Sequence, residues 1–455
     1  MKKALLQLRQ LRVAVDSLTV GSIKIAAGLA GVITSMMLAR LLTTADYGRY
    51  FLILSIVTVV STLALLGLDQ SALRLLSSAK EPGTRARLWS SHTRLLVPLS
   101  LTVAAGAYLL IPVSAQWRGE SVSWVLVALM ALWIITAVWQ RFAAESLRGG
   151  QQVILASLFG GLRNNGLFIG LGTLVAFTIC WTFDYRSLTQ LVFASVLVTL
   201  LLAVVSVGIA GIKLRPAGRS TLSKEDYRFV MAAALPLAGV TILVTLRTQV
   251  DLWLLAVVGE PTDVGLYAAV KRLAPLVFLP KMIVNGVLAP LINPRHKLGP
   301  GPLQDTLRSC ATLAAVPGSV VALVLLVAPQ ALLGGLFGDT YRQAWPILIL
   351  LSTAQLVNLI NGPNTLTLNM LGGAGKVVRY LSITTALFLV GGFFLGRAYG
   401  GLGVASAFLL LIVVYNLLQT LDVHRTLGVW TFPTFSVATL KRGLTQIDQS
   451  PNSNS

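Results

Sequence analysis

The chain has 455 residues, of which 55% are hydrophobic and 11% are charged. A soluble domain carries roughly 25% charged residues, so this composition excludes a soluble enzyme. The mean hydropathy of +0.78 indicates that most of the chain lies in lipid. The net charge of +20 would suit a nucleic-acid-binding protein, but the basic residues fall in short segments between long apolar runs.

Twelve apolar runs follow one another along the chain, most of them about 20 residues or longer, enough to cross a bilayer as a helix. Their hydropathy has no period of two, which favours helices over an outer-membrane barrel. We therefore predict an all-α polytopic membrane protein with about 12 transmembrane helices. The runs cover residues 18–42, 49–73, 95–113, 122–144, 153–180, 188–212, 230–258, 264–291, 309–334, 345–371, 380–396 and 402–422.

A basic, leucine-rich segment precedes the first run. Residues 1–17 contain Lys2, Lys3, Arg9 and Arg12, and we expect an amphipathic helix on the cytoplasmic membrane surface. The first apolar run has no clear small-residue cleavage site, which disfavours a signal peptide.

The distribution of Lys and Arg gives the topology. With the N-terminus in the cytoplasm, 24 of the 36 basic residues, Arg141 and Arg148 among them, fall on the cytoplasmic side and 5 on the opposite side. Such an asymmetry is typical of cytoplasmic loops. We predict a multi-pass membrane protein with both termini in the cytoplasm. Anionic lipid heads then account for the basic loops, and no nucleic acid partner is expected.

A short motif recurs half a chain apart. D-Y-G-R-Y at Asp46–Tyr50 is matched by D-V-G-L-Y at Asp263–Tyr267, 217 residues later, and glycine-rich turns at 148–150 and 372–373 repeat at nearly the same offset. Asp and Gly also serve locally as helix cap and turn residues.

The repeat predicts two six-helix lobes around a central cavity, related by an axis along the membrane normal. The predicted boundaries place the first lobe at 18–215, the second at 216–425 and a cytoplasmic, partly disordered tail at 426–455.

Ionisable side chains at membrane depth are costly and often functional. Basic residues outnumber acids there, which favours an anionic substrate over an organic cation. The substrate-binding candidates that would line the cavity are Lys24, Arg163, Arg247, Arg272 and Lys281.

Two acids inside the membrane, Asp69 and Asp251, are candidates for coupling transport to a proton or sodium gradient. Each also has a local alternative, because Arg247 lies four residues before Asp251 and Arg74 lies close to Asp69. No cofactor, metal site or catalytic residue is expected.

Amides recur along the tenth run and would serve as interhelical contacts or as a sugar-facing wall: Gln355, Asn358, Asn361, Asn364 and Asn369.

Six segments together resemble the Wzx-type polysaccharide flippases of the multidrug, oligosaccharidyl-lipid and polysaccharide (MOP) exporter superfamily, over nearly the whole chain. They are L-A-R-L-L-T-T-A-D-Y-G-R-Y (Leu38–Tyr50), L-G-L-D-Q-S-A-L-R (Leu66–Arg74), V-D-L-W-L-L (Val250–Leu255), D-V-G-L-Y-A-A-V-K-R-L (Asp263–Leu273), L-F-G-D-T-Y (Leu336–Tyr341) and L-N-M-L-G-G-A-G-K (Leu368–Lys376).

The resemblance implies a transporter and not an enzyme. It would move an undecaprenyl-pyrophosphate-linked oligosaccharide from the cytoplasmic to the periplasmic leaflet by alternating access, for O-antigen, capsule or exopolysaccharide synthesis. Its expected partners are this lipid, the membrane lipids, a polysaccharide polymerase and a chain-length regulator. The cationic candidates would neutralise the diphosphate.

Two alternatives stay open. A drug and toxin antiporter of the same superfamily would favour an acidic or aromatic cavity for organic cations. A membrane polysaccharide polymerase would be expected to have a long periplasmic loop with catalytic Arg or His, whereas the three histidines here fall on the cytoplasmic side.

Overall fold

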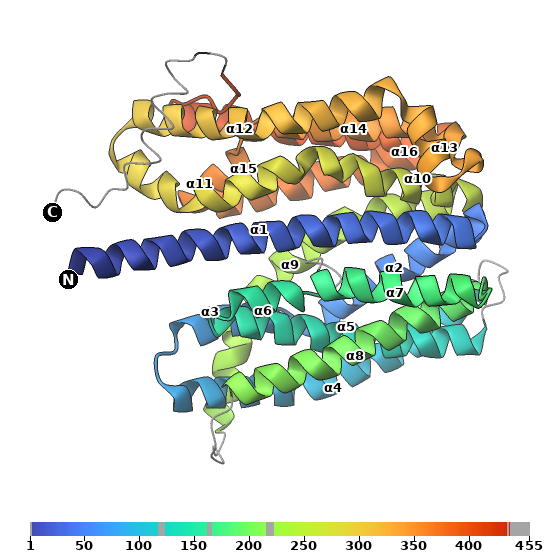
Figure 1. Ribbon diagram of the computed structural model, residues 1–455, viewed down its shortest axis with the longest axis horizontal. Coiled ribbons are helices and arrows are strands. Elements are labelled where there is room, and N and C mark those ends of the chain that lie inside the picture. Colours follow the sequence, from blue (N-terminus) through green and yellow to red (C-terminus); the bar gives the residue numbers. More distant parts are fainter. Residues whose placement is uncertain (1, 117–122, 162–165, 215–222, 435, 437–455) are drawn as a thin grey trace. The chain divides into compact units, whose positions relative to one another are not determined.

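The computed structural model describes residues 2–116, 123–161, 166–214, 223–434 and 436. Every regular element in these ranges is a helix (Figure 1). The chain divides into two compact units, Met1–Gln249 and Val250–Ser455, and the division falls inside a long helix, α9 (Lys224–Val258). The lobe boundary expected near residue 215 stays a prediction.

Unit 1 is built around one central helix, α5 (Trp124–Gly149), which packs against five others of this unit. α5 is apolar for most of its length and carries its charged residues toward its end. The other helices that begin in this unit are α1 (Lys2–Leu41), α2 (Thr44–Leu65), α3 (Leu68–Ser78), α4 (Pro82–Gln116), α6 (Val153–Leu158), α7 (Leu167–Thr182), α8 (Leu188–Leu214) and α9.

A break separates α2 from α3. Leu66 and Gly67 both have positive φ, +43° and +78°. A Cβ at Gly67 would collide with the backbone of Ala234 and Ala238 in α9, so only glycine fits this turn. The break starts a new helix inside the second predicted run and puts Asp69 in its first turn, where a carboxylate is favoured by the helix dipole.

In unit 2, α14 (Trp345–Ile360) packs against helices on several sides. The last two predicted runs form one continuous ribbon, α16 (Ala374–Leu427), with a non-helical residue at Gly400 between them. The other elements of unit 2 are α10 (Pro261–Leu273), η1 (Ala274–Phe278), α11 (Leu279–Lys297), α12 (Pro300–Val327), α13 (Pro329–Phe337), η2 (Asp339–Ala344) and α15 (Asn364–Met370).

The helices confirm the predicted fold class. Ten stretches of the described chain are long and apolar enough to cross a membrane. The shorter α7 lies within the fifth predicted run, and α16 holds two runs, so all twelve runs correspond to helices. The repeated motif also starts a helix each time: α2 begins at Thr44 and α10 at Pro261, again 217 residues apart.

Candidate functional site

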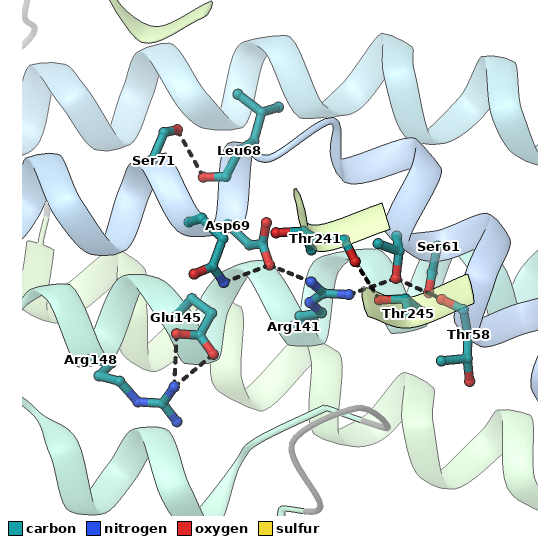
Figure 2. Close-up of polar contacts among 12 residues, drawn as sticks. Thr58, Ser61, Leu68, Asp69, Ser71, Arg141, Glu145, Arg148, Thr241 and Thr245 are labelled. Atoms are coloured by element: carbon teal, nitrogen blue, oxygen red, sulfur yellow. Dashed lines mark hydrogen bonds and ion pairs between the residues drawn. The ribbon is translucent and has the colours of Figure 1, made fainter. Parts of the chain in front are cut away.

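A buried ion pair lies at the break between α2 and α3. Arg141 of α5 donates to Asp69 Oδ2 at 2.6 Å and to the Thr62 hydroxyl of α2 at 2.8 Å. Asp69 is fully buried and Arg141 is 4% exposed. Figure 2 shows the Arg141 side chain pointing toward Asp69. The contact joins three helices of unit 1, and each charge would be costly without the other.

A second ion pair lies further along the same helix. The Arg148 guanidinium donates to both oxygens of Glu145, at 2.8 and 2.9 Å. Lys24 of α1 is close enough to both residues to interact electrostatically with them. Arg141, Glu145 and Arg148 are spaced at i, i+4 and i+7, which places them on one face of α5 (Figure 2).

The combined group of Lys24, Asp69, Arg141, Glu145 and Arg148, which we call the unit 1 cluster, contains three basic and two acidic residues. It therefore carries an excess of one positive charge when all five are ionised. Arg148 keeps 26% of its side chain exposed, and Lys24 is exposed on α1. These two cations have accessible surface with which to meet an anion.

Unit 2 holds a third ion pair, between Asp251 and Lys271. Asp251 of α9 is 3% exposed; its Oδ1 accepts from Lys271 at 2.5 Å and its Oδ2 from the Tyr267 hydroxyl at 3.3 Å. Tyr267 is the last residue of the second repeated motif. The second motif therefore supplies the start of α10 and a hydrogen bond to Asp251, and Lys271 neutralises this carboxylate.

Lys281 occupies a different setting in unit 2. It is 7% exposed, and its Nζ donates to the Asn358 carbonyl in the last turn of α14 at 2.5 Å. Beside it lies a small pocket with room for about one water molecule. Asn285, Cys310 and Gly362 are among the other residues that line this pocket.

The predicted amide stripe forms interhelical contacts at its buried members. Asn361 donates to the Asn416 amide oxygen at 2.8 Å, and Asn364 donates to the Thr420 hydroxyl at 2.9 Å, both on α16. The segment 428–434, which we call the strap, follows α16 and is bonded to the same region: Thr431 donates to Asn361 O and is within 2.7 Å of Asn364 Oδ1. These amides are satisfied by protein and hold the α14–α15 break.

The structure places the other predicted residues as follows. Arg247 and Arg272 are half-buried and both make contacts. Arg163 lies outside the described residues. The local alternative of an Asp69–Arg74 contact does not form: Arg74 is exposed, and Asp69 is bonded to Arg141 and Gln70. Asp69 and Arg74 are five residues apart in α3, a spacing at which side chains on one helix do not meet.

Arg141 and Arg148 are the residues that sequence reasoning missed, since the topology assigned both to the cytoplasmic side. A usable signal was present, because Glu145 lies four residues from one and three from the other, and a membrane-depth acid needs a partner.

Comparisons with known proteins agree with this architecture. A family model described as "Polysaccharide biosynthesis protein" matches residues 15–293. No curated protein sequence matches the chain significantly.

Solved structures resemble the chain at low sequence identity, which shows a shared fold. The lipid II flippase MurJ in an inward closed conformation has a TM-score of 0.68 and 13% identity, covering 94% of this chain and 90% of its own. An inward-facing multidrug resistance MATE transporter of the MOP superfamily has a TM-score of 0.66 and 14% identity, and the match covers 90% of this chain and 98% of that one. A MATE transporter of Vibrio cholerae has a TM-score of 0.60 and 15% identity, and the match covers 92% of this chain and 97% of that one. The chain shares the fold of these three transporters.

Proposed function

Because the chain belongs to the polysaccharide biosynthesis protein family, we propose that it is the flippase for an undecaprenyl-pyrophosphate-linked oligosaccharide. It would move this lipid from the cytoplasmic to the periplasmic leaflet of the bacterial inner membrane by alternating access, for O-antigen, capsule or exopolysaccharide synthesis. The observation that carries the proposal is the family match over residues 15–293 on a transporter fold that the chain shares with a lipid II flippase.

The chemistry of the unit 1 cluster supports an anionic substrate. A diphosphate carries negative charge that basic side chains neutralise through charge-assisted hydrogen bonds. Lys24 and Arg148 have exposed surface, and the cluster has one positive charge in excess. We propose these two residues as diphosphate contacts, with Arg247, Arg272 and Arg163 as further candidates.

The drug antiporter alternative is less well supported by the charges. An organic cation would need an acidic or aromatic site. Asp69 is paired with Arg141 and Asp251 with Lys271, so both predicted acids already have a basic partner. If either acid couples transport to an ion gradient, that basic residue must first give up the carboxylate.

Deletion of the gene tests this function in cells. We expect the deletion strain to lose surface polysaccharide and to accumulate the lipid-linked oligosaccharide in the inner membrane, and expression of the chain to reverse both effects. Unchanged surface polysaccharide together with increased sensitivity to cationic drugs would support the antiporter instead. If the chain were a polymerase, the deletion strain would still display single repeat units on the cell surface. This result distinguishes a polymerase from a flippase and from a drug antiporter.

A further inference from the structure

Lys281 is a buried basic residue whose hydrogen bond and ring contact are both with uncharged groups. Its Nζ donates to the Asn358 carbonyl at 2.5 Å and lies 5.3 Å from the centre of the Phe278 ring. Among the residues that the structure describes, no Asp or Glu forms an ion pair with it. Arg141 and Lys271, in contrast, each hold a carboxylate.

This difference decides which of the three side chains can give up a proton. Loss of a proton from Lys271 would leave the Asp251 carboxylate buried without a compensating charge, which is unfavourable. The guanidinium of an arginine is not deprotonated in proteins. Deprotonation of Lys281 leaves no carboxylate of the described residues without its ion-pair partner.

The geometry around Lys281 accommodates both protonation states. Asn358 lies in the last turn of α14, where the helix dipole favours a cation, and the Phe278 ring does the same. A neutral amine still has an N–H to donate to the Asn358 carbonyl. The hydrogen bond therefore does not depend on the charge.

The pocket beside Lys281 supplies a place for the proton acceptor, because it has room for about one water molecule. Of the other residues that line it, Cys310 on α12 has the one titratable side chain. Asp305 and Arg308 lie five and two residues before Cys310 on α12, and neither lines the pocket. The packed segments η1, α14 and α15 contain no titratable residue.

We propose that Lys281 binds and releases a proton during the transport cycle and so couples substrate movement to a proton gradient. In the release step one N–H bond of the ammonium breaks, the electron pair stays on Nζ, and the proton passes to a water molecule in the pocket. The reverse step restores the ammonium from hydronium. The coupling rests on the proposed flippase function, whereas proton binding by Lys281 does not.

Proton binding is tested without substrate. Full-length protein carrying ¹⁵N-lysine is placed in lipid nanodiscs, and the Lys281 ¹⁵Nζ signal is assigned by its loss in Lys281→Arg. We expect this signal to change between the ammonium and amine positions over the range of pH that cells maintain across the membrane. A signal that stays at the ammonium position throughout overturns the proposal.

Coupling is tested in proteoliposomes loaded with undecaprenyl-pyrophosphate oligosaccharide extracted from the deletion strain. With one proton per lipid, a gradient of one pH unit shifts the equilibrium distribution between leaflets by about tenfold. Lys281→Arg keeps the charge but cannot release a proton. With this variant we expect the pH gradient to leave the distribution of the lipid between leaflets unchanged. The control Lys376→Arg, altered at a half-exposed residue paired with Asp422, keeps the shift.

The outcomes separate the two proposals. A Lys281→Arg protein that retains the tenfold shift overturns coupling through Lys281. A wild-type protein that moves no lipid-linked oligosaccharide counts against the flippase function, and the ¹⁵N signal alone then decides whether Lys281 binds a proton.

Discussion

Arg141 donates a 2.6 Å hydrogen bond to Asp69, and this buried contact joins α5 to the start of α3 within unit 1. The two side chains are 5% and 0% exposed. The pair exists because the break at Leu66 and Gly67 turns α3 toward the central helix. A buried ion pair of this kind makes the local structure sensitive to loss of either partner.

Replacement of Arg141 by Met is expected to destabilise the protein by about 3–5 kcal/mol, because Asp69 would stay buried without its partner. Thermal unfolding of the purified protein in detergent measures the effect. Arg342→Ala, in an exposed pair with Asp339, is the control and should change stability by less than about 1 kcal/mol. Equal stability of Arg141→Met and the wild type would contradict the role assigned to the pair.

Replacement of Gly67 by Ala is expected to destabilise the protein by several kcal/mol. The positive φ disfavours a side chain, and the new Cβ would meet backbone atoms of Ala234 and Ala238. The matched control is Gly106→Ala, at a helical site with no atom near the added Cβ, where a gain of about 0.5–1 kcal/mol is expected. Thermal unfolding compares the two, and a Gly67→Ala protein as stable as the control would refute the account of the break.

The strap is expected to stabilise the α14–α15 break through Thr431. Thr431→Val removes the hydroxyl that contacts Asn361 and Asn364 and should cost about 1–3 kcal/mol, because buried polar atoms lose their partner. Thr426→Val, at an exposed hydroxyl on α16, should change little. Thermal unfolding distinguishes them; indistinguishable midpoints would show that the strap does not hold the break.

The cationic contacts make a prediction about transport. Lys24→Ala, Arg148→Ala and Arg247→Ala are each expected to lower surface polysaccharide severely while the protein still inserts, because diphosphate binding loses a charge-assisted bond. Arg397→Ala, at an exposed basic residue of α16, is the control. Polysaccharide and membrane-inserted protein are measured in the deletion strain. Full polymer from all three variants would rule out these residues as substrate contacts.

The helices could be predicted from sequence because each apolar run is long enough to span a bilayer, and the repeat at Asp46 and Asp263 starts a helix as expected. The breaks were less accessible. Nothing in the hydropathy of 49–73 shows that the backbone turns at Leu66 and Gly67, since the turn depends on the close approach of α9.

The candidate site could be predicted only in part, for the same reason. Asp69 and Asp251 were identifiable as acids at membrane depth, but their partners Arg141 and Lys271 lie 72 and 20 residues away in the sequence. Hydropathy and charge counts give membrane depth, whereas pairing depends on which helices pack together. Charge counting therefore does not indicate that Arg141 is buried against α2 and α3.

The central claim is that the chain moves a lipid-linked oligosaccharide between leaflets. The most direct measurement reconstitutes the purified protein in proteoliposomes with undecaprenyl-pyrophosphate oligosaccharide in the inner leaflet and follows its accessibility to an added glycosidase. The account predicts that wild-type protein exposes the sugar and that Arg148→Ala does so far more slowly. Sugar that stays protected in the presence of correctly inserted wild-type protein would contradict it.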